Sequence, residues 1–375
     1  NLGSSYSYNS SDLSINFNKN DGNTIENRIK NTGNYLNLKG IVERKIGIIS
    51  TIRGGFETNS TSEKFDNSYF NGKYNDFLTS VFAETDLGFS NHFSTKIGVR
   101  AENSSFFNQW NFAPRIAFAY RLDKKWTSSV AYGIFYQNPE SKYLNTKSQI
   151  GYQKAEHYIF QLQRSVEGQT LRMEAFYKKY DRLLKTQGDQ YYQYAINNNG
   201  RGEAKGIELF WRDKKTFKTI DYNISYSYLD TKRDYMNYPI QLVPGFAAEH
   251  TLSAVAKKFV TNWKTGFNLS YTYASGRPYY DIVTQNGENI IRNEGQLKNY
   301  NALNFSLNYL PNLGKKDAKA FTVLVLSISN ILGSKNVYGY NFSSTGIRSA
   351  VVPPVNTFVF VGAFISFGVD KTEDA

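Results

Sequence analysis

The side chains most often used in catalysis are few and scattered in this sequence. Its three histidines, His92, His157 and His250, lie far apart, and the chain has no cysteine. Thiolate chemistry is therefore excluded, and no His/Cys group has the spacing of a zinc site. The glycine-rich run 200–206 has the wrong spacing for a dinucleotide-binding fingerprint, and no helical pattern follows it. We expect no enzyme site, no metal site and no cofactor.

Tyrosines grouped with amides and an arginine suggest non-covalent binding instead. Such a group suits a sugar, a peptide or a metal chelate, because aromatic faces and a few polar groups together fix a ligand. The candidates lie in two polar segments and are Tyr191, Tyr192, Tyr194, Arg201, Tyr279 and Tyr280. Binding residues are commonly carried on loops by a rigid scaffold. The alternative is that these rings only pack loop against loop or lie at a membrane interface.

The elements that must position these segments are strands with one apolar and one polar face. In the segment 263–274, apolar or aromatic residues alternate with small or polar ones: Trp263, Thr265, Phe267, Leu269, Tyr271 and Tyr273 share one face. The segments 93–99, 126–136, 220–228 and 303–309 repeat this pattern. We count about sixteen such strands, most of them roughly 10–16 residues long. A tilted strand needs only about 9–11 residues to cross a bilayer.

Short and long connections alternate along the chain. Short turns are predicted near 43–46, 88–92, 122–125, 166–169, 214–219, 259–262 and 311–319. Long polar loops are predicted near 18–34, 59–75, 138–155, 184–200, 232–249, 278–299 and 332–356. Transmembrane barrels have this layout, with tight turns in the periplasm and longer loops outside the cell. The prediction is an all-β fold, a transmembrane antiparallel up-and-down β-barrel that occupies residues 1–375 as one region.

The net charge of +12 raises the question of an anionic partner. The basic residues gather at the predicted short turns, for example at Lys214, Lys215, Lys257 and Lys258. There they can meet anionic lipid head groups, although an ordinary solvated turn is the alternative. A nucleic-acid groove would need basic residues on one continuous face with stacking aromatics, so no nucleic-acid partner is expected.

Several segments resemble strands of TonB-dependent outer-membrane receptors. The runs NFAPRIAFAY (111–120) and WTSSVAYGIFYQNP (126–139) are similar to one hairpin of that family. The run VLSISNILGSKNVYGY (325–340) resembles its penultimate strand, and TFVFVGAFISFG (357–368) resembles its closing strand. The order of these segments along the chain is more specific than any one of them.

The resemblance implies a barrel of 22 strands whose lumen is filled by a plug. The sixteen strands would then be the last part of a receptor barrel, with the plug and the first strands absent. The implied function is uptake of a bulky nutrient (a metal chelate, vitamin, oligosaccharide or peptide) through the outer membrane of a Gram-negative bacterium. The implied partners are outer-membrane lipid and lipopolysaccharide, the remaining receptor polypeptide, and TonB acting through the absent N-terminal part. A surface lipoprotein is kept open as a further partner.

Two other functions stay open on the sequence alone. About sixteen strands can also close into a passive porin with an aqueous channel. A barrel can also serve as a surface-binding or secretion-associated scaffold, because fold does not settle function. Pairing between the strand near Tyr6 and the strand near Phe364 would favour the porin. Two unpaired edges would favour the receptor barrel.

Overall fold

The computed structural model describes residues 1–18, 24–47, 49–67, 71–144, 150–187, 195–315 and 318–368. Its main element is one antiparallel sheet of sixteen strands. The strands are β1 (Leu2–Asn18), β2 (Thr24–Ile46), β3 (Ser50–Asn67), β4 (Asn71–Gly88), β5 (Phe93–Ser104), β6 (Gln109–Arg121), β7 (Trp126–Gln137), β8 (Gln153–Val166), β9 (Gln169–Gln187), β10 (Ala195–Asp213), β11 (Ile220–Asp234), β12 (His250–Val260), β13 (Thr265–Ala274), β16 (Tyr300–Tyr309), β17 (Ala320–Ser329) and β20 (Phe358–Phe367). Within the described ranges, no helix has both the length and the apolar character needed to cross a membrane.

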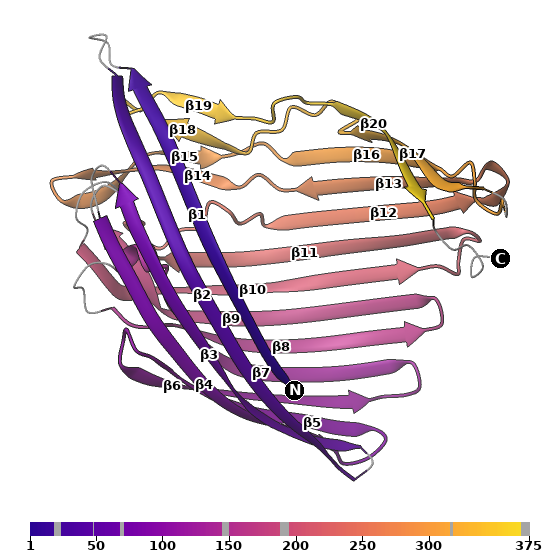
Figure 1. Ribbon diagram of the computed structural model, residues 1–375, viewed down its shortest axis with the longest axis horizontal. Coiled ribbons are helices and arrows are strands. Elements are labelled where there is room, and N and C mark those ends of the chain that lie inside the picture. The colour runs from indigo at the N-terminus through magenta and orange to yellow at the C-terminus, as the bar shows by residue number, and fades with distance from the viewer. Residues whose placement is uncertain are drawn as a thin grey trace.

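The sheet follows the order of the chain, so each strand pairs with the next one in sequence. The exceptions are two separate hairpins, β14 (Pro278–Gln285) with β15 (Glu288–Gln296) and β18 (Gly339–Phe342) with β19 (Arg348–Val351). The sheet curls round on itself, with the long loops and both hairpins at one end and the short turns at the other (Figure 1). The observed fold confirms the predicted all-β, up-and-down architecture.

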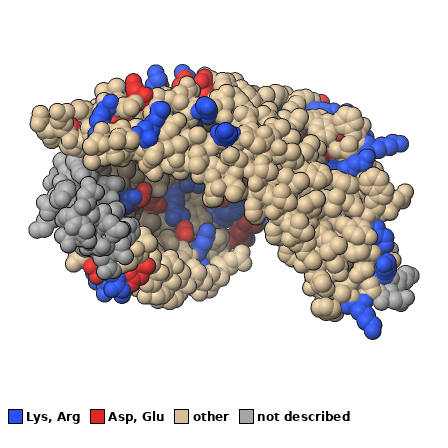
Figure 2. Space-filling model, turned by 90° about the horizontal axis from the view of Figure 1, so that it is seen from above, with Lys and Arg blue, Asp and Glu red and all other residues tan. Residues whose placement is uncertain are grey.

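The two edge strands of the sheet do not pair. In the described part of the chain, no hydrogen-bonded register joins β1 to β20. Figure 2 shows an opening into the hollow interior, in which both Lys/Arg and Asp/Glu side chains gather. Of the two outcomes set out from the sequence, this arrangement favours a receptor barrel over a closed porin of sixteen strands.

The strand register sorts side chains into an apolar outer face and a polar inner face. On the outer face, Leu269, Phe305 and Ile328 lie opposite one another across β13, β16 and β17. On the inner face of the same strands, the Asn268 amide donates to the Ser306 hydroxyl at 3.4 Å. Many apolar side chains of the outer face are exposed, as in Leu269 (44%). An exposed apolar band on strands that are hydrogen-bonded to their neighbours is typical of the lipid-facing surface of a membrane barrel.

Charged side chains bridge the inner wall of the first strands. Arg53 of β3 pairs with Glu43 of β2 at 3.0 Å and with Glu84 of β4 at 2.5 Å. Nearer the loop end, Arg100 of β5 pairs with Glu57 at 3.2 Å and with Glu102 at 3.1 Å. Each of these guanidiniums thus meets two or more carboxylates, so this part of the wall is polar with its charges matched.

The strands are longer than the sequence pattern indicated. The predicted turn at 43–46 is wrong, because β2 continues to Ile46 and the turn follows it. The predicted loops 18–34, 59–75 and 184–200 are also largely strand, since β2 starts at Thr24, β3 ends at Asn67 and β10 starts at Ala195. Trp263 belongs to the short 3-10 turn Thr261–Trp263 instead of β13. A strand with polar residues on both faces shows no apolar–polar alternation in its sequence, although its backbone is hydrogen-bonded to its neighbours.

At the loop end of β8–β11, the outer face carries charges in strict alternation. In one row, Glu156, Lys179, Glu203 and Lys232 lie opposite one another across the four strands. In the next row the signs are reversed, and its members are Lys154, Asp181, Arg201 and Asp234. We call these eight residues the charge checkerboard. Every cross-strand neighbour within it has the opposite sign, which stabilises the pairing.

Two of the short turns are closed by aspartates. The carboxylate of Asp213, at the end of β10, is buried and accepts backbone N–H groups of Lys215 (2.7 Å) and Thr216 (2.9 Å). Burial raises the pKa of Asp213, but the hydrogen bonds from Thr216, Lys215 and Gln169 outweigh it and hold this pKa well below its usual range. Asp123 closes the turn between β6 and β7 in the same way.

Candidate functional site

The loops at one end of the barrel have a small hydrophobic core of their own. Tyr74, Leu144, Ile150 and Leu184 are buried against each other, and the partly buried Phe65, Phe107, Tyr143, Ile196 and Met236 pack on them. Because these residues come from strand ends and loops far apart in sequence, the described parts of the loops pack together as a layer at the mouth of the hollow. A ligand that approaches from this side contacts side chains that are already packed against one another.

The carboxylate of Asp76 in β4 fastens this layer to the wall. It is 6% exposed. It accepts hydrogen bonds from the hydroxyl of Ser104 (2.7 Å) and the amide of Asn138 (3.1 Å). It also accepts from the backbone N–H of Phe106 (3.1 Å) and the hydroxyls of Tyr74 and Ser105. One buried anion thus joins β4, the turn after β5 and the loop after β7.

The β14–β15 hairpin reaches back to the loop ends of β9 and β11. Near its tip, the Asn289 amide donates to the backbone carbonyls of Thr186 and Asn237, both at 3.0 Å. The base of the hairpin is tight at Gly276, where a Cβ would lie 1.8 Å from the carbonyl oxygen of Leu297. Only glycine fits there. The hairpin therefore joins the segment after β13 to the loop ends of β9 and β11.

The structure describes three of the six residues predicted to bind a ligand, and these three do not form one cluster. Tyr191, Tyr192 and Tyr194 lie outside the described residues. Arg201 is exposed and lies within β10, on the outer face in the charge checkerboard. Tyr279 and Tyr280 are consecutive in β14 and contact different groups. Of the described candidates, only the Tyr279–Tyr280 pair lies at the mouth.

Tyr279 belongs to a cluster between the two hairpins. Its ring lies 4.8 Å from the ring of Tyr340 and 6.1 Å from that of Phe342. The guanidinium of Arg348 lies 4.3 Å from the Tyr340 ring and donates to the Tyr279 hydroxyl. This cation is therefore engaged within the cluster, which joins β14 to β18 and β19.

Tyr280 begins a line of tyrosines that leads back to β11. Its ring lies 5.7 Å from that of Tyr238, which lies 5.0 Å from that of Tyr235. Burial raises the pKa of Tyr235 to about 12, and burial also raises the pKa of Tyr280. Both hydroxyls stay protonated at neutral pH and present hydrogen-bond donors beside aromatic faces.

Arg233, which sequence reasoning missed, lies at the β11 end of this line. Its guanidinium lies 4.3 Å from the centre of the Tyr180 ring, 5.8 Å from that of Tyr235 and 5.3 Å from that of Phe246. Tyr180 and Arg233 flank Gly202 in the sheet. We call Arg233, Tyr180, Tyr235 and Phe246 the arginine cage. Nothing in the spacing of these residues brings them together; only the strand register does.

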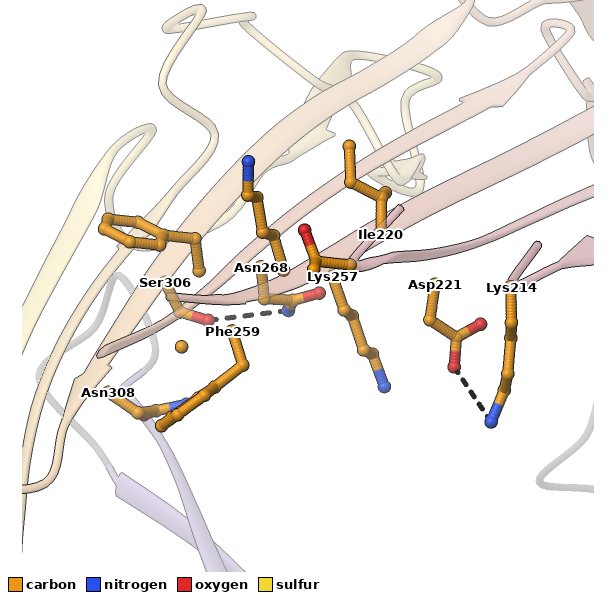
Figure 3. Close-up of a pocket in the computed structure, with 12 residues that line it drawn as sticks. Lys214, Ile220, Asp221, Lys257, Phe259, Asn268, Ser306 and Asn308 are labelled. Atoms are coloured by element: carbon orange, nitrogen blue, oxygen red, sulfur yellow. Dashed lines mark hydrogen bonds and ion pairs between the residues drawn. The ribbon is translucent and has the colours of Figure 1, made fainter. Parts of the chain in front are cut away.

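A second hollow lies at the turn end of the inner wall, away from the loops. It measures about 550 Å³ and is lined by residues of β11, β12, β13 and β16. Figure 3 shows Lys214 paired with Asp221 and Asn268 bonded to Ser306, with Lys257 between these pairs. Asp221 is already matched by Arg212 at 2.9 Å and by Lys214 at 3.4 Å. In the ranges that the structure describes, no group of three or more His, Cys, Asp or Glu could hold a metal ion.

Comparison with known proteins identifies the wall. The family model for the TonB dependent receptor-like β-barrel matches residues 1–331. A variant of the ferric enterobactin receptor of Pseudomonas aeruginosa superposes with a TM-score of 0.68 at 13% identity, over 97% of this chain and 59% of that chain. The outer membrane transporter YddB of Escherichia coli gives 0.67 at 12%, over 92% and 55%. No curated protein matches the sequence.

The ferric-catecholate import receptor Fiu of Escherichia coli is similar to the same extent, with a TM-score of 0.66 at 11% identity, over 92% of this chain and 56% of that chain. The chain thus spans a little over half the length of the solved chains that it resembles. At such low identity the superpositions show the fold, whereas the sequence match over residues 1–331 shows the family. The chain belongs to the TonB-dependent receptor β-barrel family, whose members are transport proteins of the bacterial outer membrane and not enzymes.

Proposed function

We propose that this chain is the wall of a receptor that captures a bulky nutrient at its extracellular mouth and admits it through the outer membrane. The observation that carries the proposal is the family match over residues 1–331, joined to an ordered mouth with cation–aromatic clusters. The nutrient classes are a metal chelate, a vitamin, an oligosaccharide or a peptide. Two of the similar solved proteins are described as receptors for ferric chelates, which favours the first class.

The two faces of the sheet are suited to different parts of this transport function. The outer face is apolar and holds the protein in lipid. The inner face is polar, with matched ion pairs such as Arg53–Glu84, so it lines a path for a hydrated solute or packs against polar polypeptide. The loops and the β14–β15 hairpin form the binding surface. No residue here needs to perform covalent chemistry.

The expected partners follow from the same proposal. A plug fills the lumen, further polypeptide completes the wall between β1 and β20, and TonB supplies the force that moves the plug. Two open sheet edges in lipid would leave backbone groups without partners, which is unfavourable by several kcal/mol for each group. Lipid and lipopolysaccharide surround the outer face, and a surface lipoprotein over the loops is a further candidate.

The test is uptake by cells that carry or lack the gene. Deletion and complemented strains are supplied with labelled ferric chelates, a corrinoid, oligosaccharides and peptides, with and without a protonophore. We expect one class to be taken up in a way that needs both the gene and the proton gradient. Gene-dependent entry of all small solutes that ignores the protonophore would instead indicate a passive porin. Equal uptake by both strains in every class would refute transport.

A further inference from the structure

We propose that the arginine cage is a binding site for an anionic group, a carboxylate or a phosphate, of the nutrient. This inference rests on the proposed function and adds the substrate class that the site selects. The site is built on Arg233, whose guanidinium is surrounded by the rings of Tyr180, Tyr235 and Phe246.

The sheet itself shapes the cage. Gly202 lies between Tyr180 and Arg233, and a Cβ at that position would come within 2.8 Å of the Arg233 Cγ. The missing side chain therefore lets the arginine lie across β10 toward the Tyr180 ring. The backbone of Arg233 also exchanges two hydrogen bonds with Leu242, of 2.8 and 2.9 Å. These bonds hold the loop that brings Phe246 against the guanidinium.

The charge of Arg233 has no counterion in the described ranges. No carboxylate there lies within ion-pair distance of it, and its buried Nε has no hydrogen-bond partner. Arg53, Arg100 and Arg292 differ, because each of them is paired with at least one carboxylate. A partly buried cation without a partner is unfavourable, and an anion that binds it recovers that free energy.

The Nε of Arg233 is buried, so in the proposed complex the anion binds at the terminal N–H groups of the guanidinium. A ring that stacks on a guanidinium uses its face, whereas the N–H groups point outward along its edge in a fork that matches two oxygens of a carboxylate or phosphate. Phe246 is 55% exposed, so an apolar part of the ligand can lie against it. The line Tyr235, Tyr238 and Tyr280 continues the surface toward the β14–β15 hairpin.

The position of the cage agrees with its proposed task. Arg233 is the last inner-face residue of β11, beside the loop layer, whereas its neighbour Lys232 faces outward in the charge checkerboard. A ligand held at Arg233 would thus lie at the top of the hollow, where entry begins. Removal of the Lys232 charge changes the same net charge one residue away, on the wrong face, which makes it a matched control.

The first test measures binding of simple anions to the purified receptor in detergent, with the polypeptide that completes its wall present. Citrate and inorganic phosphate are titrated calorimetrically into the parent protein and into Arg233→Gln, Arg233→Lys and Lys232→Gln. We expect Arg233→Gln to weaken citrate binding by a factor of about ten or more and Arg233→Lys to weaken it less, because an ammonium keeps the charge but not the fork. Lys232→Gln should match the parent. Equal affinities in Arg233→Gln and the parent, or no binding of either anion to the parent, would overturn the inference.

Two readouts keep this result separate from folding and from the proposed function. The shift in electrophoretic mobility on heating shows whether each variant is folded, and Arg233→Lys tests the charge if Arg233→Gln does not fold. In cells, energy-dependent uptake of only a neutral nutrient, unchanged in Arg233→Gln, would overturn the anionic class while the transport function stands. If no nutrient is taken up while citrate still binds through Arg233, the transport proposal fails and the site remains.

Discussion

Removal of the buried carboxylate of Asp76 should loosen the loop layer without dissolving the barrel. The series is Asp76→Asn and Asp76→Ala, with Asn75→Ala as control. Asp76 is 6% exposed and accepts five hydrogen bonds, which include one from the fully buried Ser104 hydroxyl. Asn75 is the adjacent, exposed residue of β4, and its side chain accepts one hydrogen bond from Ser62.

The magnitudes follow from what each variant leaves unpaired. A hydrogen bond to a charged group is worth about 1.5–3 kcal/mol, and a buried donor left without its acceptor loses a similar amount. Asp76→Ala leaves several hydrogen-bond donors without an acceptor, so the free energy of unfolding should fall by about 3–5 kcal/mol. Asparagine keeps one acceptor oxygen and should lose about 1–2 kcal/mol. Asn75→Ala should change stability by less than about 0.5 kcal/mol, as exposed substitutions usually do.

The assay is urea unfolding of the receptor, with the polypeptide that completes its wall, in lipid vesicles, combined with amide hydrogen exchange of the segments 104–108 and 138–144. Faster exchange in those two segments should accompany the loss of stability in Asp76→Ala, while the middle of β9 stays protected. The reasoning is refuted if Asp76→Ala is no less stable than Asn75→Ala, or if exchange increases evenly over all strands.

Three further outcomes are expected. Asn289→Ala removes the two bonds at the tip of the β14–β15 hairpin, so hydrogen exchange in the hairpin should quicken; unchanged protection would contradict its role as an anchor. In Gly206→Val the Cβ would meet the carbonyl oxygen of Tyr228 at 2.2 Å, so the yield of folded protein should fall strongly, as heat-modifiability gels can measure, whereas Gly3→Val, which meets nothing within 4 Å, should fold normally. The lowered pKa of Asp213 means that its carboxylate stabilises the fold above the ordinary pKa near 3.9 and loses this effect as the pH falls toward the folded pKa. Urea midpoints of Asp213→Asn should therefore depend less on pH below about 4 than those of the parent.

The alternation of side chains was enough to predict the wall. Two faces, about sixteen strands and the short turns at 88–92, 122–125 and 214–219 are as the sequence indicated, because half-buried strands carry a period of two. The loop lengths were not predictable in this way. Apart from Phe65 and Tyr74, residues 59–67 and 71–75 are polar on both faces, so no period marks them, yet their backbones pair across β3 and β4.

The mouth was predictable only where its residues are neighbours in sequence. Tyr279 and Tyr280 stood out as a pair, and both are in contact with rings of other loops. The arginine cage was missed because Tyr180, Gly202 and Arg233 come from three strands. Their meeting depends on the register of β9, β10 and β11, which a single sequence does not display. From the sequence alone, a polar strand end is predicted as a loop, because only its register shows that it pairs with a neighbouring strand.

The charge checkerboard has a consequence for how this wall assembles. A strand that slips by one residue turns its apolar face inward, which the bilayer rejects. A slip by two residues leaves each side chain on its original face, so the alternation of apolar and polar residues does not oppose it. Between β10 and β11, such a slip would set Arg201 against Lys232 or Glu203 against Asp234, and between β9 and β10 it would set Asp181 against Glu203. Like charges directly opposite each other are unfavourable. The alternating signs thus disfavour a two-residue misalignment of these strands while the sheet forms at the membrane surface.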